Sequence, residues 1–311
     1  MIETKNERKI DFSHIRLEDR EMYEEHLMLE DERGCEFSFA NLYLWGRQNM
    51  AVVDGHIALF SQFDRRSVYP YPLGAGDKRG VLDRIIADAA ERGIPCRITG
   101  LGERARETIE SLYPGRFRFH SDEGSYDYVY DINDLADLPG RKYHAKRNHM
   151  ARFVEANPDY TIEQINEENI AEAHAFTDAW YARRLAENPD ADFHMERVAL
   201  ERAFRDFGAL SLVGLMLRTS EGVVAITIAS RMSPDTLDVH FEKARADIQG
   251  AYVAINCSFA RYIRDSYPEI RYLDREEDMG LEGLRRAKQS YHPHHRVKKY
   301  WACLLEDGYD Y

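Results

Sequence analysis

The chain has 311 residues, a formal net charge of −13 at pH 7 and 44% apolar residues. Its length exceeds the usual size of one hydrophobic core and favours two domains, and its composition excludes a disordered or low-complexity protein. The longest nearly apolar stretch, residues 209–217, is much shorter than the roughly 20 residues of a membrane-spanning helix. The first residues alternate in charge and lack the apolar core of a signal peptide, so we expect a cytoplasmic protein.

Cysteine and histidine usage indicates no metal centre. The four cysteines are Cys35, Cys96, Cys257 and Cys303. They are far apart and have apolar neighbours, which favours buried reduced thiols over disulfides or metal ligands. The three histidines in residues 292–295 are interrupted by Pro293, and such a run does not readily converge on one ion. We therefore expect neither a metal site nor a tightly bound cofactor.

The predicted elements of the first half begin with "AVVDGHIALFSQF" (51–63), which indicates two strands joined by a tight turn at Asp54-Gly55. The elements predicted after it are a strand at 68–71, the glycine-rich loop 72–80, an amphipathic helix at 81–92, a strand at 94–100, a helix at 103–112 and a strand at 127–132.

The second half repeats this order. A hairpin is predicted over residues 210–231, with its turn near Glu221-Gly222. The elements predicted after it are a strand at 236–242, a loop at 243–249, a helix at 250–265, a strand at 269–275, a helix at 281–291 and a strand at 297–305. The repetition indicates two copies of one α/β unit, a domain 1–138 and a domain 139–311, joined around Pro139-Gly140.

The order hairpin, strand, loop, helix, strand, helix, strand is that of the GNAT acyltransferase fold. We therefore expect two tandem GNAT-like α/β (α+β) domains, each with a mixed sheet flanked by helices. In that fold, the loop after the central strand and the start of the next helix present backbone N–H groups to a phosphate. The corresponding loop here is "EKARADIQGAY" (242–252).

This loop is the candidate donor site. The candidate phosphate-binding residues are Gln249, Gly250 and Ala251. GNAT acetyltransferases generally have Arg or Gln three residues before the glycine, where the coenzyme A pyrophosphate binds, but Asp247 stands here. A carboxylate repels a diphosphate, which favours the single phosphates of a tRNA 3′ end or a lipid head group. The alternative is an ordinary strand-to-helix turn.

Two windows contain several cations and no acid. Residues 141–152 hold five Lys or Arg residues, and residues 285–299 hold six. We expect the first window to form a helix with Tyr143 and Phe153 turned inward and its cations outside. The candidate phosphate-binding residues are Arg141, Lys142, Lys146, Arg147, Arg152, Arg285, Lys288 and Lys298, with Tyr291 as a stacking partner. The alternatives are solvated helix faces and, for the aromatic residue, core packing.

The strand "TLDVHFE" supplies the candidate catalytic residues. Regular alternation places Asp238, His240 and Glu242 on one face, with Lys243 directly after them. One of the three titratable groups would act as the base, and Lys243 would stabilise a phosphate or an oxyanion. A polar face turned to solvent is the alternative.

Four segments, 37–46, 140–153, 237–256 and 272–293, resemble soluble bacterial proteins of the family of the phosphatidylglycerol lysyltransferase C-terminal domain. The likeness covers nearly the whole chain. It implies transfer of an aminoacyl group from aminoacyl-tRNA to a hydroxyl or amine acceptor, such as a phosphatidylglycerol-type lipid. We expect the second domain to carry the reaction and the first to be degenerate.

Two alternatives stay open at this point. Acyl-coenzyme A is the alternative donor, and a non-catalytic module that binds tRNA or anionic phospholipid head groups is the alternative to an enzyme. With no membrane-embedded part in the sequence, a lipid acceptor would have to be reached from the water side, at the periphery of a membrane.

Overall fold

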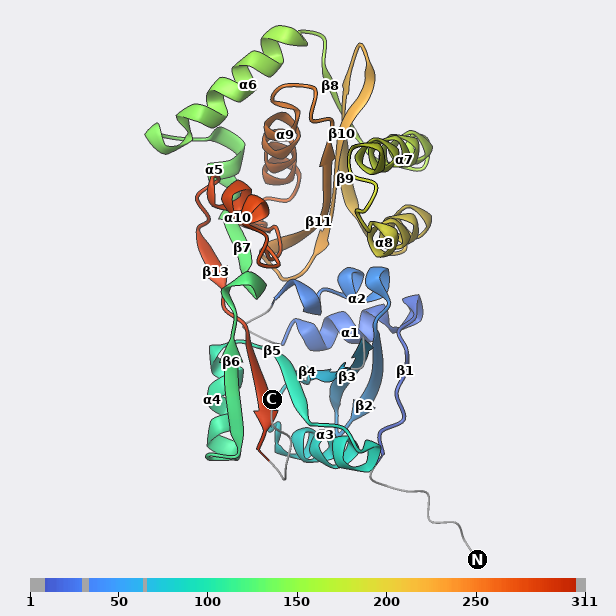
Figure 1. Ribbon diagram of the computed structural model, residues 1–311, viewed down its shortest axis with the longest axis vertical. Coiled ribbons are helices and arrows are strands. Elements are labelled where there is room, and N and C mark those ends of the chain that lie inside the picture. Colours follow the sequence, from blue (N-terminus) through green and yellow to red (C-terminus); the bar gives the residue numbers. More distant parts are fainter. Residues whose placement is uncertain (1–8, 30–33, 64–65, 306–311) are drawn as a thin grey trace, which may run out of the picture. The chain divides into compact units, whose positions relative to one another are not determined.

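The computed structural model describes residues 9–29, 34–63 and 66–305, and the chain forms two compact units (Figure 1). The first unit combines the chain up to Asp127 with the segment from Val297, and the second spans Tyr128–Arg296. Residues 1–8, on which most of the signal-peptide prediction depends, lie outside the described residues.

The first unit contains a sheet with the strand order β1-β2-β3-β4-β5-β14-β6. The strands are β1 (Ser13–His14), β2 (Gln48–Val53), β3 (His56–Phe63), β4 (Arg66–Pro70), β5 (Arg97–Leu101), β6 (Phe117–Ser121) and β14 (Tyr300–Leu304). The helices are α1 (Arg20–Leu27), α2 (Phe39–Trp45), α3 (Arg79–Arg92) and α4 (Glu103–Leu112), with 3₁₀ turns η1 (Leu17–Asp19), η2 (Cys35–Phe37) and η3 (Glu123–Ser125). Asp54 and Gly55 both have positive φ, 50° and 75°, as the predicted hairpin turn requires.

The second unit contains a sheet with the strand order β13-β7-β12-β11-β10-β9-β8. The strands are β7 (Asp127–Asp131), β8 (Thr161–Gln164), β9 (Val213–Thr219), β10 (Gly222–Arg231), β11 (Thr236–Ala244), β12 (Tyr272–Asp274) and β13 (His295–Val297). The helices are α5 (Ile132–Asp137), α6 (His144–Ala156, preceded by the 3₁₀ turn η4, Arg141–Tyr143), α7 (Ile170–Glu187), α8 (His194–Arg205), α9 (Ala251–Ser266) and α10 (Glu282–Gln289).

The two sheets have corresponding strand orders, and the prediction of two GNAT-like α/β units is confirmed. The final strands of the two halves are exchanged, however. β7 ends the first half in sequence but pairs with β12, and β14 ends the chain but lies between β5 and β6. The single boundary predicted between residues 138 and 139 therefore differs from the observed division, because each sheet is completed by a strand from the other half of the sequence.

Helices cover both faces of the second sheet. Figure 1 shows α9 on one face and α7 with α8 on the other. Apolar residues of α9, such as Ile255 and Phe259, form the core of this unit with Leu237 and Val239 of β11. The α9 face and the α7–α8 face are therefore separate environments for side chains that leave β11.

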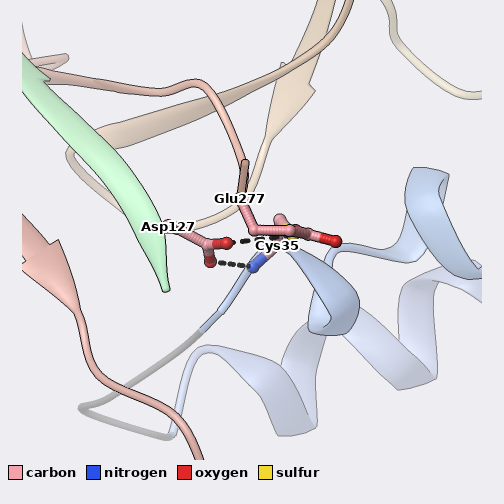
Figure 2. Close-up of side chains that lie close together, drawn as sticks. All are labelled: Cys35, Asp127 and Glu277. Atoms are coloured by element: carbon pink, nitrogen blue, oxygen red, sulfur yellow. Dashed lines mark hydrogen bonds between the residues drawn. The ribbon is translucent and has the colours of Figure 1, made fainter. Parts of the chain in front are cut away.

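A buried ionic cluster in the first unit contains Lys299, one of the cations of the window 285–299. Backbone N–H of Cys35 donates to Asp127 Oδ2 at 2.8 Å, and the Cys35 thiol donates to Oδ1 at 3.4 Å (Figure 2). Lys299 lies 2.7 Å from Asp127 Oδ1 and 2.6 Å from Glu36 Oε2, with 8% of its side chain exposed. All four cysteines are buried thiols, as predicted. Lys299 is therefore a structural residue and not a surface cation.

Candidate functional site

The central strand β11 contains a bulge. Its register with β10 shifts between Ile228 and Ala229, which leaves His240 as an extra residue. Directly opposed residues of antiparallel strands share a face, so the bulge reverses the alternation beyond it. Asp238 and Glu242 consequently lie on opposite faces, and the prediction of one polar face is wrong.

The candidate catalytic residues are thereby divided between the two faces of the sheet. Glu242 lies on the α9 face, where Asn256 Nδ2 donates to Oε2 at 3.2 Å. Lys243 lies on the α7–α8 face, with Nζ 2.5 Å from Glu196 Oε1 and 4.6 Å from the centroid of the Trp180 ring. The structure does not bring Glu242 and Lys243 together.

A polar cluster, which we call the Glu242 cluster, occupies the α9 face where β11 and β12 separate. It consists of Glu242, Asn256, Arg275, Tyr291 and Lys146. β12 pairs with β11 only through Tyr272–Asp274, and the next residue, Arg275, donates from Nη2 to Glu242 Oε1 at 2.7 Å. Only 16% of the Arg275 side chain and 9% of the Glu242 side chain are exposed, so this ion pair is largely removed from water.

Lys146 of α6 completes the Glu242 cluster. The sequence placed it on the outer face of its helix, but it is half-buried, with Nζ 3.7 Å from the centroid of the Tyr291 ring. The same ring lies 5.1 Å from the Arg275 guanidinium. Burial, and then the nearby Arg275 charge, lower the pKa of Lys146 to about 8. The prediction that Lys146 lies exposed on the outer face is therefore wrong, its role in phosphate binding stays a prediction, and its ammonium can lose a proton near pH 8.

A second polar group lies around the bulge. His240 Nε2 is 2.8 Å from Ser230 Oγ, and its Nδ1 is 3.4 Å from Asp238 Oδ2 and 3.6 Å from Glu276 Oε1. The His240 and Asp238 side chains are 1% and 0% exposed. One nitrogen and two carboxylate oxygens can thus share a proton or a cation.

Gly250 serves helix packing. Its φ is +86°, and a Cβ atom there would collide with the His149 carbonyl oxygen and lie 2.9 Å from Phe153 Cβ, both in α6. Glycine is required because α6 approaches the start of α9 so closely. The side of Gly250 on which a Cβ atom would lie is thus occupied by α6, and phosphate binding by Gln249, Gly250 and Ala251 stays a prediction.

Asp247 in the same loop is already neutralised. Arg183 Nη1 lies 2.6 Å from Asp247 Oδ1, and Arg245 Nη2 lies 2.7 Å from Oδ2. Hydrogen bonds from Arg245 and Arg183 hold the pKa of Asp247 well below its usual range. Arg245 also pairs with Glu221 at 2.9 Å. The arginines at this loop are therefore committed to carboxylates of the protein.

A pocket of about 650 Å³, which we call the α7–β11 pocket, opens at this loop. Its lining includes Trp180, Arg183 and Arg184 of α7, Arg245 of the loop and Tyr252 of α9. It adjoins the end of β11 at Ala244, but Glu242, Lys243 and Gly250 are not among its lining residues.

Most of the candidate phosphate-binding cations in residues 285–299 bind groups of the protein itself. Lys288 is buried and donates from Nζ to the carbonyl oxygens of Arg275 and Glu276. Arg285 pairs with Asp278 at 2.9 Å. Lys298 is exposed but belongs to the first unit. Lys288 and Arg285, two of the candidate phosphate-binding residues, therefore bind groups of their own loop.

The two basic windows nevertheless meet in the second unit. Tyr143 donates its hydroxyl to the Tyr291 carbonyl at 2.8 Å, and the His292 ring packs against the Tyr143 ring with centroids 5.2 Å apart. Lys146 and Tyr291 form a further contact, and His292 Nε2 lies 3.2 Å from the Lys142 carbonyl oxygen. The contact between the windows is therefore aromatic, with one cation, Lys146, at its centre.

The outer face of α6 keeps an exposed positive charge. Arg141 and Arg152 are exposed and form no ion pair among the residues that the structure describes. Lys142 pairs with Asp134 at 3.0 Å, and Arg147 donates to the carbonyl oxygens of Leu138 and Gly140. Two of the five cations predicted to bind phosphate are thus available on this surface.

The chain belongs to the family described as "Phosphatidylglycerol lysyltransferase, C-terminal", whose model matches residues 28–303. A lysyltransferase moves an aminoacyl group, so the family places the chain among acyltransferase-type proteins.

Individual proteins and solved structures are also similar to this chain. A conserved protein of unknown function from Bacteroides thetaiotaomicron is 36% identical, with a TM-score of 0.90 over 95% of this chain and 99% of that one. L-PGS from Bacillus licheniformis shares the fold at 15% identity, with a TM-score of 0.66 over 93% of each chain. An uncharacterised protein of Mycoplasmoides gallisepticum is 22% identical over 59% of this chain, and the match spans 58% of that protein.

Within the described ranges, none of the helices has both the length and the apolar character needed to cross a bilayer.

Proposed function

We propose that the second unit is an aminoacyltransferase that moves an aminoacyl group from aminoacyl-tRNA to a hydroxyl or amine acceptor, such as a phosphatidylglycerol-type lipid. The single observation that carries the proposal is Lys146, a half-buried amine with a pKa lowered to about 8 beside the Glu242–Arg275 pair. The family match supports the same reaction class.

The reaction needs a base at one point and an acid at another. The acceptor oxygen or nitrogen attacks the ester carbonyl, the ester C–O bond to the terminal ribose breaks, and the acceptor proton must leave. In our proposal neutral Lys146 takes that proton and then returns it to the ribose oxygen, so atoms and charge balance. Catalysis by a positioned base typically contributes ~10²–10⁴-fold in rate.

Arg275 and Glu242 would position this chemistry. Arg275 carries a fixed positive charge close to Lys146, which adds to burial in lowering the amine's pKa and would favour the negative charge of the tetrahedral intermediate. Glu242 holds the guanidinium through a 2.7 Å contact. The exposed Arg141 of η4 and Arg152 of α6 would attract the phosphates of tRNA or of an anionic lipid surface at the membrane periphery.

Asp247 favours aminoacyl-tRNA over acyl-coenzyme A as the donor. The two arginines nearest this position together bind its one carboxylate, so a ligand that displaces this carboxylate takes the place of a single anionic group, which suits a monophosphate better than a diphosphate. The catalytic roles proposed from sequence for Asp238, His240 and Lys243 are less well supported, because these side chains leave β11 on the face opposite Glu242.

The test is a transfer assay with the full chain. A pool of tRNA charged with labelled amino acids is incubated with phosphatidylglycerol vesicles, and label entering the organic phase is counted with wild-type protein, Lys146→Met and no protein. We expect label transfer by the wild type only. A parallel arm contains labelled acetyl-coenzyme A and amine acceptors. Acetyl transfer without aminoacyl transfer would establish the alternative donor, and binding without any transfer would leave a non-catalytic module.

A further inference from the structure

The α7–β11 pocket combines aromatic and cationic walls. Trp180 is fixed by its indole N–H, which donates to the Ala244 carbonyl at 2.9 Å. Tyr252, in the first turn of α9, keeps 39% of its surface exposed. Arg183, Arg184 and Arg245 form the cationic part of the lining. Aromatic faces beside arginines are the recurrent means by which proteins bind unpaired bases and their phosphates.

We propose that the α7–β11 pocket binds the 3′-terminal purine nucleotide of an RNA donor, with the base on Tyr252 and the phosphate at Arg183 and Arg245. This assignment rests on the proposed function and adds the donor's binding site to it. The pocket volume of about 650 Å³ falls within the range of small-ligand sites and exceeds the need of one nucleotide.

The position of the pocket on β11 suits such a donor. Tyr252 lines the pocket and is close enough to Glu242 and Arg275 of the Glu242 cluster to interact with both electrostatically. A nucleotide in the pocket would therefore present its aminoacylated ribose toward the Glu242 cluster and Lys146.

Asp247 acts in this proposal as an internal competitor for the phosphate. Its ion pair with Arg183 is exposed, with 48% and 43% of the two side chains accessible, and exposed ion pairs contribute little to stability. An incoming phosphate can replace the carboxylate at small cost. Removing the Asp247 charge should therefore strengthen nucleotide binding, whereas removing Arg183 should weaken it.

The experiment is calorimetric titration of the full chain with AMP, adenosine and inorganic phosphate. We expect AMP to bind at least about tenfold more tightly than adenosine or phosphate, because its base contacts Tyr252 and its phosphate contacts the arginines. Tyr252→Ala should weaken AMP and adenosine about 5- to 100-fold, the range found for base stacking. Arg183→Ala should weaken AMP but not adenosine. Asp247→Asn should strengthen AMP about 2- to 5-fold.

Arg231→Ala is the matched control, because Arg231 forms an ion pair with Glu269 of similar exposure, 49% and 48%, outside the pocket. It should leave all three affinities unchanged. The inference is overturned if AMP binds no more tightly than phosphate, or if Tyr252→Ala and Arg183→Ala both retain wild-type AMP affinity.

Failure of this inference can be separated from failure of the proposed function. If the pocket variants lose AMP binding but no aminoacyl transfer occurs with any tRNA, the pocket is a nucleotide-binding site and the proposed aminoacyltransferase function is refuted. If wild type and pocket variants transfer aminoacyl groups with equal kcat and KM, the proposed aminoacyltransferase function is supported, but this pocket is not the donor site.

Discussion

Lys146 of α6 places its ammonium 3.7 Å from the centroid of the Tyr291 ring, which follows α10, and so joins two segments that lie 145 residues apart in sequence. A cation over an aromatic face is stabilised when it is shielded from water, yet burial here also penalises the charge. The net effect is the lowered pKa of about 8. Lys146 thus differs from Arg141 and Arg152, the exposed cations of the same segment.

The first prediction concerns the pH dependence of transfer. The neutral amine is the base, so the rate should rise with pH and level off above the Lys146 pKa of about 8. Lys146→Met should reduce the rate ~10²–10⁴-fold. Rates are measured from pH 6 to 9 and corrected for spontaneous ester hydrolysis. Lys142→Met, which removes an exposed ion pair with Asp134, is the control and should retain activity. Equal rates for Lys146→Met and wild type would exclude Lys146 as the base.

The second prediction concerns stability and pH. The folded pKa of Lys146, about 8, lies below the ordinary value of 10.5, so the unfolded chain binds more protons between these values. Its contribution to the free energy of unfolding is therefore least favourable below pH 8 and improves as pH rises toward 10.5. Lys146→Met should stabilise the protein at pH 7 by on the order of 1–2 kcal/mol, less than the full shift implies because the amine is only half-buried.

Urea denaturation at pH 7 and at pH 10 tests this second prediction. The difference between Lys146→Met and wild type should shrink at pH 10. A constant difference would show that packing, and not the charge, sets the stability at this position.

The third prediction concerns the Glu242–Arg275 pair. Glu242→Gln leaves a buried guanidinium without its carboxylate and should lower the free energy of unfolding by about 3–5 kcal/mol. The double variant Glu242→Gln, Arg275→Met removes both charges and should recover most of that loss. Urea denaturation of the two single variants and the double variant gives the coupling energy. A coupling near zero would mean that the 2.7 Å contact contributes nothing to folding.

Local signals were sufficient to predict most of the elements. The turn at Asp54-Gly55 and the one ending at Gly222 need positive φ, and these residues supply it, so both hairpins could be read from sequence. The inward positions of Tyr143 and Phe153 also follow from helical spacing, and both are fully buried. Such features depend on neighbours within a few residues.

The strand exchange and the bulge depend on distant partners. No local pattern states that β14 inserts between β5 and β6, because any final strand satisfies the same alternation. The bulge at His240 breaks the two-residue period that assigned Asp238 and Glu242 to one face. The inward turn of Lys146 was missed for a related reason. A lysine reads as exposed unless its partner, here Tyr291, is known.

The last prediction separates packing from ligand binding at Gly250. Gly250→Ala places a Cβ atom against the His149 carbonyl of α6 and requires a positive φ of +86°. The backbone strain alone costs about 1–3 kcal/mol, and displacement of α6 adds to it. Gly115→Ala is the matched control, since Gly115 has φ +70° and a Cβ atom there would meet nothing within 4 Å, so it should show the strain alone. Urea denaturation should therefore give a larger loss for Gly250→Ala than for Gly115→Ala. Equal losses, accompanied by weaker tRNA binding for Gly250→Ala only, would instead restore Gly250 as a phosphate-binding residue.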